Sequence, residues 1–311
     1  MDDKPATPRT ETMADHICVC ICTFRRPGLL ARLLDKLRDQ FTDRRFDFSI
    51  IVVDNDNSQS AKPVVDSFRQ NSEIGISYCF EPEQNISLAR NTGIRNAKEG
   101  FIAFIDDDEF PDDHWLFHLH QACRRYAPAG VLGPVIPHYE IEPPSWVIKG
   151  KLCERKTFAT GTSLLSPRDT RTGNVLFDRT IFRADEEPFD PQYGRSGGED
   201  SDFFRRMIKC GHLFVWCNEG FVYENVPAER LKRSYFLKRA LLRGTLNARH
   251  RPLFSLDTAK SFFAFLGYTM ALPALFLIGQ HAFMKYLIKD CDHIGKLLGR
   301  FGIKVMKERS F

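Results

Sequence analysis

The sequence lacks several features that would narrow its function at once. Its 311 residues contain no internal repeat, no low-complexity tract and no secretory signal at the beginning. The net charge of +4 is too small to predict a nucleic-acid partner. The nine cysteines show no disulfide-framework spacing, so we expect free thiols and a reducing cytosol. With 43% apolar residues, the chain can bury one large core or two smaller ones.

The first residues have the composition of a disordered tail. Residues 1–15 are polar and include Pro5 and Pro8, and Met13 is an alternative start of the protein. Immediately afterwards, Cys18, Cys20 and Cys22 alternate along one predicted strand. Residues two apart on a strand are about 7 Å apart, which is too far for sulfurs that share a tetrahedral zinc. We therefore predict that these cysteines are small core residues.

From residue 17 onwards, strand and helix patterns alternate. Short apolar runs predict strands at 17–22, 48–53, 76–80, 101–105, 131–136 and 174–177. Helical stripes follow Pro27 and Pro63, and further helices are predicted at about 86–98 and 112–126. Strands that alternate with helices over short connections predict an α/β fold, with a mostly parallel central sheet flanked by helices.

Four carboxylates follow the predicted strand at 101–105 directly: Asp106, Asp107, Asp108 and Glu109. Parallel sheets bind ligands just beyond the carboxyl ends of their strands, and Thr23 and Asp54 end two other strands of this sheet. Carboxylates this close repel each other unless a cation lies among them. The Asp-x-Asp pair of Asp106 and Asp108 therefore predicts a site for Mg²⁺ or Mn²⁺. The alternative is a solvated acidic loop in which Asp112 caps the next helix.

A second acidic pair, Glu199 and Asp200, follows the glycine-rich stretch Gly194–Gly198 and begins a predicted helix that ends at Gly211. Acidic residues at a helix N-terminus are favourable in themselves, so helix capping is one interpretation. The glycines also suit a mobile loop that presents a carboxylate to a substrate. The pattern alone leaves both interpretations open.

The composition changes after residue 228. Residues 230–251 contain eight Lys or Arg and no Asp or Glu, and residues 285–307 form a basic amphipathic tail. Between them, residues 261–278 are almost wholly apolar and reach the lower limit of a membrane span. A basic run before an apolar segment is typical of the anionic cytoplasmic face of a membrane. We expect residues 229–311 to form a helical, membrane-associated region; a helical hairpin packed on the preceding domain is the alternative.

Five blocks of sequence together resemble family 2 glycosyltransferases of the GT-A fold. They are Cys-Thr-Phe-Arg-Arg-Pro at 22–27, Val-Val-Asp-Asn-Asp at 52–56, Asn-Ile-Ser-Leu-Ala-Arg-Asn-Thr-Gly at 85–93, Phe-Ile-Asp-Asp-Asp-Glu at 104–109 and Gly-Gly-Glu-Asp at 197–200. Gly-Pro-Val at 133–135 and Pro-x-Trp at 144–146 are most similar to the succinoglycan-type exopolysaccharide glucosyltransferases. The resemblance implies a GT-A glycosyltransferase domain at 16–228.

The resemblance implies that a nucleotide binds at the ends of the first strands. Thr23, Arg25 and Asp54 would hold the nucleotide, and Asp54 would accept a hydrogen bond from the base. Arg90 would reach the phosphates or the ribose, and Asp106 would face the ribose.

It also implies a metal site and a base. Asp108 would hold Mg²⁺ or Mn²⁺, Asp200 would be the general base, and Glu199 would help to place the acceptor. Many relatives have a metal- or diphosphate-binding His 24 residues after the base, where this chain has Glu224. Because a carboxylate also ligates these ions, we predict a metal role for Glu224.

These roles predict an inverting, metal-dependent transfer of a hexosyl group, expected to be glucose, from a UDP-sugar. The expected acceptor is a polyprenyl-diphosphate-linked saccharide of exopolysaccharide or surface-glycan synthesis, at the cytoplasmic face of a bacterial cell membrane. The Gln-x-x-Arg-Trp block of processive synthases is missing, which predicts one sugar per encounter. The alternatives are a sugar nucleotidyltransferase and a non-catalytic membrane-surface binding protein. We expect no nucleic-acid partner, because the basic run has few interleaved aromatics.

Overall fold

The computed structural model describes residues 15–98, 100–182, 187–248 and 255–303. The predicted disordered tail up to residue 14, with the alternative start at Met13, lies outside these residues, as do the ends of the two basic runs, 249–251 and 304–307. Asp15, which we placed in the tail, instead begins the first strand, and its carboxylate contacts Nε2 of His120 at 2.7 Å.

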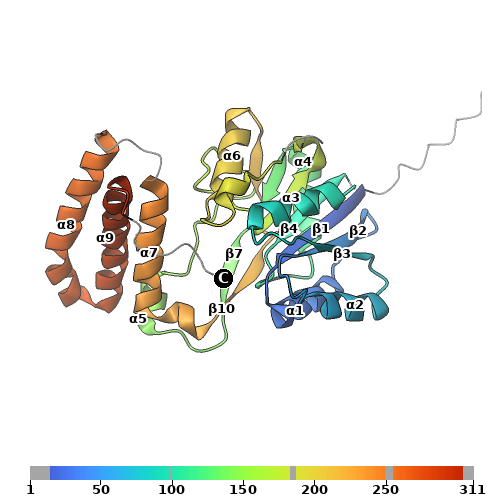
Figure 1. The fold of residues 1–311 in the computed structure, drawn as a ribbon, viewed down its shortest axis with the longest axis horizontal. Helices are drawn as coiled ribbons and strands as arrows, with labels where there is room; N and C mark the ends of the chain where they lie inside the picture. Colours follow the sequence, from blue (N-terminus) through green and yellow to red (C-terminus); the bar gives the residue numbers. More distant parts are fainter. Residues whose placement is uncertain (1–14, 99, 183–186, 249–254, 304–311) are drawn as a thin grey trace, which may run out of the picture.

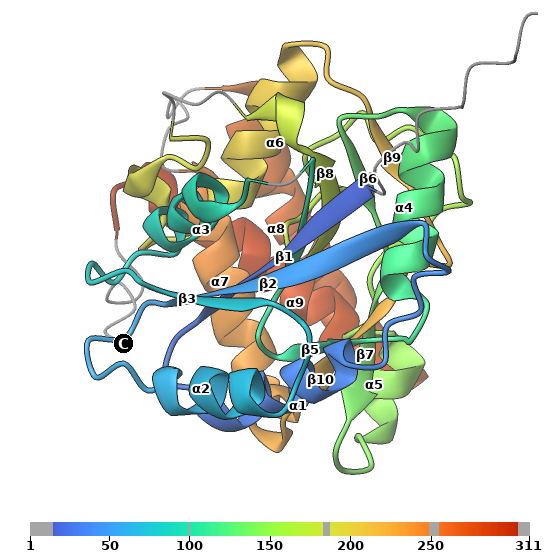
Figure 2. The same cartoon turned by 90° about the vertical axis from the view of Figure 1, so that its right-hand side faces the viewer.

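A seven-stranded sheet in the order β3-β2-β1-β4-β8-β6-β9 forms the centre of the molecule (Figure 2). The strands β1 (Asp15–Thr23), β2 (Phe46–Asp54), β3 (Ile76–Phe80) and β4 (Phe101–Ile105) run parallel to one another. Next, β8 (Asn174–Asp178) runs antiparallel to β4 and to β6 (Gly130–Leu132), and β9 (Phe214–Trp216) is parallel to β6. The prediction of a mostly parallel central sheet is confirmed.

Helices cover both faces of this sheet, and side chains alternate between the two cores. Ile17, Val19 and Ile21 of β1 face the core formed with α1 (Pro27–Leu37), α2 (Lys62–Gln70) and α4 (Trp115–Tyr126). Cys18 and Cys20 face the other core, with α3 (Ile86–Asn96) and α6 (Glu199–Lys209). These two cysteines are buried, as predicted.

Cysteine is small enough to let α3 approach the sheet. A Cβ atom on Gly93 would lie 3.5 Å from the Cys20 sulfur, which is ordinary contact distance. Cys22 packs against the same core but is only partly buried, because it also lines a cavity described below.

A second, three-stranded sheet consists of β5 (Glu109–Pro111), β10 (Val222–Val226) and β7 (Val135–Tyr139), with β10 in the middle. We predicted one strand at 131–136, but β6 and β7 belong to different sheets. Gly133 and Pro134 separate them, and Gly133 lies so close to Gly220 that a Cβ atom would overlap its carbonyl oxygen.

The C-terminal helices form a separate group beside the sheet (Figure 1). After the 3₁₀ turn η3 (Ala228–Leu231), α7 (Arg233–Ala248) packs on α9 (Gln280–Arg300), and α9 packs on α8 (Leu256–Ile278) and on α5 (Ser145–Gly150). Gly244 of α7 and Gly295 and Gly299 of α9 let the two backbones touch, since a Cβ atom would clash at each position. Trp146, Phe236 and Met284 join α5, α7 and α9 in a third core.

The predicted apolar segment at 261–278 is part of the exposed helix α8. Among the residues that the structure describes, α8 is the helix with the length and composition to cross a membrane. The mean hydropathy of its most apolar 18-residue window is 1.9, yet only 6% of that window is buried inside the molecule. The helix continues through Pro273 and forms a hairpin with α9. The helical hairpin that we gave as the alternative is therefore present, its apolar helix α8 is exposed, and association with a membrane stays a prediction.

Candidate active site

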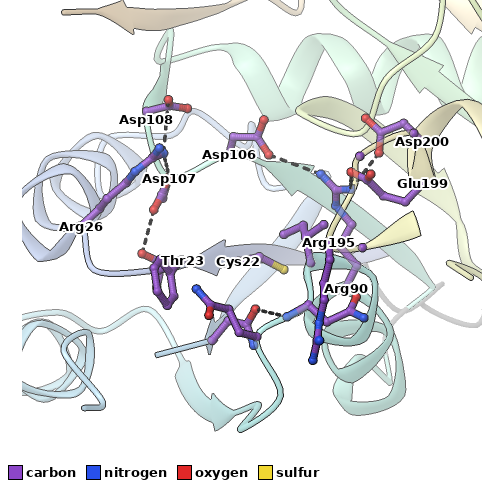
Figure 3. Close-up of a pocket in the computed structure, with 18 of the residues that line it drawn as sticks. Cys22, Thr23, Arg26, Arg90, Asp106, Asp107, Asp108, Arg195, Glu199 and Asp200 are labelled. Atoms are coloured by element: carbon purple, nitrogen blue, oxygen red, sulfur yellow. Dashed lines mark hydrogen bonds and ion pairs between the residues drawn. The ribbon is translucent and has the colours of Figure 1, made fainter. Parts of the chain in front are cut away.

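A cavity of about 730 Å³ lies at the carboxyl edge of the parallel strands, with α7 lining its other side. Thr23 ends β1, Asp106 follows β4, and the two belong to strands that pair in parallel. The start of α6 contributes Glu199 and Asp200. Figure 3 shows these acids on two sides of the cavity, with Arg90 between them. Of the three polar strand ends that we predicted to meet, Thr23 and Asp106 line this cavity.

Two of the three aspartates after β4 are held by Thr23, at the end of β1, and by Arg26, which directly precedes α1. Thr23 donates a hydrogen bond to Asp107 at 2.8 Å. Arg26 donates to Asp107 at 2.9 Å and to Asp108 at 3.3 Å (Figure 3). Part of the repulsion among the carboxylates is thus offset by a guanidinium of the chain itself. Asp106, whose side chain is about half exposed, points into the cavity.

Arg90 joins the strand end to α6. One of its nitrogens, Nη1, donates to Glu199 at 2.7 Å and to Asp200 at 2.8 Å, and Nη2 lies 3.8 Å from Asp106. The block at 85–93 holds Arg90 in place: Asn85 caps α3 by accepting from the Ser87 amide. One guanidinium therefore contacts the acids of both the strand end and the start of α6.

Glu199 and Asp200 differ in their surroundings. Gly197 and Gly198 have φ of +82° and +104°, a region that favours glycine, so the chain can turn sharply into α6. Asp200 accepts from the Thr172 hydroxyl at 2.6 Å, and 26% of its side chain is exposed. Glu199 is buried, and within the described part of the chain its Oε2 has no hydrogen-bond partner. Burial, and then the neighbouring Asp200, raise the pKa of Glu199 above its usual range.

The acids predicted to hold a metal converge on one guanidinium. Arg230 donates to Asp108 at 3.0 Å and to Glu224 at 2.9 Å, and Arg155 also pairs with Glu224. Pairing of β10 with β5 and β7 carries Glu224 to this place, and the Asn225 amide donates to the Asp108 carbonyl.

The same pair of acids suits a hard cation. Carboxylate oxygens are the ligands that Mg²⁺ and Mn²⁺ prefer. Asp108 and Glu224 are close enough to share one cation, because both contact the guanidinium of Arg230. Among the described residues, no group of three or more His, Cys, Asp or Glu side chains is arranged to hold a metal. A cation here would rest on two carboxylates and on oxygens of a substrate, as is common for Mg²⁺.

Two of the predicted nucleotide-binding residues lie outside the cavity lining. Asp54 is fully buried, and it accepts from the amides of Asp56 and Ala61 and from the Tyr78 hydroxyl. Arg25 is largely exposed and donates to Asp56 at 3.0 Å. The structure brings together the other seven predicted residues: Thr23, Arg90, Asp106, Asp108, Glu199, Asp200 and Glu224.

Sequence reasoning missed several cations of the cavity. They are Arg26, Arg155, Arg195, Arg230, Lys238 and Arg239. Arg155 and Arg195 lie in irregular segments, where no helix or strand periodicity predicts which way a side chain points. The last three belong to the basic run at 230–251, which we assigned to a membrane surface because of its charge. Positions 235, 238, 239 and 242 lie three and four apart, so they share one face of α7. This spacing could have indicated a common ligand, but we considered only the number of charges in the run.

Comparisons with known proteins agree with this fold, which is the GT-A fold. The mannosyltransferase PcManGT from Pyrobaculum calidifontis, solved with GDP-Man and Mn²⁺, superposes with a TM-score of 0.57 at 18% identity, covering 92% of this chain and 88% of that one. S. aureus TarS 1–349 in complex with UDP gives 0.53 at 14% identity, covering 93% of each chain.

The sequence comparisons name the family. The model of glycosyl transferase family 2 matches residues 18–183. The succinoglycan biosynthesis protein ExoM of Rhizobium meliloti (strain 1021) is 35% identical over 237 residues, which are 75% of this chain and 74% of ExoM. The chondroitin synthase of Escherichia coli is 24% identical over 253 residues, or 36% of that longer protein. The chain belongs to glycosyltransferase family 2, and it is a glycosyltransferase rather than a nucleotidyltransferase or a non-catalytic binding protein.

Proposed function

We propose that this glycosyltransferase moves one hexosyl group, glucose, from a UDP-sugar to a polyprenyl-diphosphate-linked saccharide of exopolysaccharide synthesis, with inversion. The observation that carries the proposal is one cavity that Asp108 and Asp200 both line, with Arg90 contacting Asp106 on one side and Asp200 on the other. The relationship to ExoM supports an exopolysaccharide pathway. The UDP complex of TarS and the GDP-Man and Mn²⁺ complex of PcManGT support a nucleotide-sugar donor.

The donor binds at the strand-end side of the cavity in this proposal. Thr23, Arg90 and Asp106 lie around the place where the nucleotide and its diphosphate enter. Asp108, with Glu224, would hold Mg²⁺ or Mn²⁺ once Arg230 is displaced from the two carboxylates. When bound, the metal offsets the charge that develops on the leaving diphosphate.

Asp200 acts as the general base. An acceptor hydroxyl is a poor nucleophile near neutral pH, so its proton must be removed as its oxygen attacks the anomeric carbon. The new carbon–oxygen bond forms as the bond to the diphosphate breaks, with the proton going to Asp200 and the electron pair to the leaving group. Asp200 is the base of the two acids in this proposal because its carboxylate is partly exposed in the cavity, whereas Glu199 is buried. Glu199 then positions Arg90 and the acceptor.

The exposed apolar helix α8 supports attachment to a membrane, where a polyprenyl-linked acceptor would reside. An apolar face of this size is costly in water, and surfaces of this kind mark contacts with partners or membranes. We propose a peripheral or single-segment attachment at the cytoplasmic face, where nucleotide sugars are available.

Two substitutions test the roles of the acids. In Asp200→Asn, we expect turnover of the UDP-sugar to fall by about 10²–10⁴-fold because the base is lost. UDP affinity, measured by calorimetry with Mn²⁺, should stay within about twofold. In Asp108→Ala, the affinity for UDP should fall and should no longer respond to Mn²⁺ or to EDTA.

The exposed Asp113, which lies outside the cavity, provides the matched control Asp113→Asn. It should leave both measurements unchanged. Near-normal turnover in Asp200→Asn would remove the base assignment, and metal-responsive UDP binding in Asp108→Ala would remove the metal assignment. The product of an α-linked UDP-sugar should carry a β-linkage by NMR, and retention of the α configuration would contradict inversion.

A further inference from the structure

One wall of the cavity is built by the C-terminal helices. Tyr235, Lys238, Arg239 and Leu242 of α7 line the cavity, and they lie three and four residues apart, on one face of the helix. On another face, Phe236 and Ala240 are buried, and Gly244 touches the backbone of α9. The helix α7 is thus fixed on α9 while its cationic face remains turned to the catalytic cavity.

The cations of this face differ from the others in the cavity. Arg26, Arg90, Arg155, Arg195 and Arg230 each pair with one or more carboxylates. Within the described part of the chain, Lys238 and Arg239 have no acidic partner, and Arg239 contacts the Tyr235 hydroxyl at 3.3 Å. Two adjacent, unpaired cations in a cavity predict an anionic ligand, because Lys and Arg bind phosphate oxygens strongly.

We infer that Lys238 and Arg239 bind the diphosphate of the lipid-linked acceptor. This inference rests on the proposed function and names a subsite within it. The strand-end wall, where Thr23 and Asp106 lie, is the side proposed for the donor diphosphate, and α7 lies on the opposite wall. The α7 face also belongs to the same helical group as the exposed apolar helix α8, through contacts with α9.

This placement gives the acceptor one orientation. A diphosphate on α7 keeps its lipid near the apolar helices, and it directs its saccharide towards Asp200 across the cavity. Arg230, which directly precedes α7, links the same wall to Asp108 and Glu224. The basic run therefore recognises a specific headgroup, whereas a general attraction to anionic lipid would not require a cavity.

Binding to vesicles separates these possibilities. The probes are phosphatidylcholine vesicles with geranylgeranyl diphosphate, and vesicles in which phosphatidylglycerol supplies the same total charge. We expect the wild-type protein to bind the diphosphate vesicles at least tenfold more tightly. The double variant Lys238→Gln/Arg239→Gln should lose this preference while its UDP affinity stays within twofold.

A matched control is the double variant Lys232→Gln/Arg233→Gln. It removes the same charges from the same basic run, at exposed positions that lie outside the cavity lining. It should keep the preference for diphosphate vesicles.

Each other outcome overturns the inference. Equal weakening by both double variants would mean a general surface attraction, and a parallel loss of UDP affinity in Lys238→Gln/Arg239→Gln would assign the cations to the donor. A wild-type protein without the preference would also overturn it. Failure of the proposed function is a separate result, since it would appear as absent sugar transfer by the wild-type enzyme.

Discussion

The two walls of the cavity differ in how their charges are satisfied. On the strand-end and α6 side, Arg26 and Arg90 connect five carboxylates in pairs that the fold holds in place. On the α7 side, Lys238 and Arg239 have no such partners among the described residues. A wall whose charges are already paired is preorganised for chemistry, because little must move when the reaction occurs. Cations without acidic partners, such as those of the α7 side, can instead attract an anionic ligand.

Substitution of Arg90 should disrupt the ion pairs of the strand-end and α6 side and have the largest effect on stability and turnover. In Arg90→Ala, the buried Glu199 and the adjacent Asp200 lose their shared cation. We expect the free energy of unfolding to fall by about 3 kcal/mol, because breaking a buried pair leaves an uncompensated charge. Turnover should fall at least about a hundredfold, since the base and its orientation are both disturbed. Urea unfolding and a UDP-release assay measure the two effects.

Arg195→Ala is the comparison for this substitution. Arg195 also lines the cavity, but its side chain is 61% exposed and pairs with the exposed Glu83. Exposed pairs contribute about 0–1 kcal/mol, so its stability should hardly change. Equal losses in the two variants would show that Arg90 has no special structural position.

Gly295→Ala should disturb the other region and leave the paired wall intact. A Cβ atom on Gly295 would overlap the carbonyl oxygen of Leu241, so α7 and α9 would have to separate. Overpacking of this kind costs about 1–3 kcal/mol. We expect weaker binding to diphosphate vesicles, because α7 moves, and unchanged UDP affinity by calorimetry.

Gly267→Ala is its control in the same group of helices. Gly267 lies within α8, and a Cβ atom there would meet nothing within 4 Å among the described residues. Alanine is favoured over glycine in helices, so stability should stay the same or rise by up to about 1 kcal/mol. A loss of UDP affinity in Gly295→Ala would show that the two walls do not behave as separate regions.

The same contrast explains what the sequence could predict. The strands β1, β2 and β4 are apolar runs that end abruptly in polar residues, and parallel pairing places all such ends at one edge. Thr23, Asp106 and Asp108 could therefore be predicted from local pattern. The resemblance to family 2 added Asp200 and Glu224, which come from distant parts of the chain.

The rest depended on tertiary contacts that no local pattern reports. Arg230 lies in a short 3₁₀ turn, yet it bridges Asp108, which is 122 residues away. The strand β10, which we did not predict, carries Glu224 into the cavity by pairing with β5 and β7. Asp54 followed the strand-end rule, but its carboxylate turns back to bind the amides of Asp56 and Ala61. A strand end predicts position along the sheet edge and leaves the direction of the side chain open.

Substitutions on the exposed face of α8 should have the smallest effect on stability, but they should weaken binding of the protein to membranes. Phe263 and Met270 lie seven residues apart on one face of this helix, and their exposed fractions are 69% and 82%. The double variant Phe263→Gln/Met270→Gln removes no internal contact of consequence, so its free energy of unfolding should stay within about 0.5 kcal/mol. Burying each side chain in lipid is worth about 1.5–3 kcal/mol, so vesicle binding should fall at least about tenfold.

Co-sedimentation with phosphatidylcholine and phosphatidylglycerol vesicles that lack diphosphate lipid measures this effect apart from the α7 face. Leu165→Gln is the matched control, because Leu165 is 78% exposed and lies in the irregular region outside the C-terminal helices. Undiminished vesicle binding in the double variant would mean that this face of α8 does not contact lipid. The two regions would then be distinguished by their charges alone, and attachment of the enzyme to a membrane would have to depend on the cations of α7.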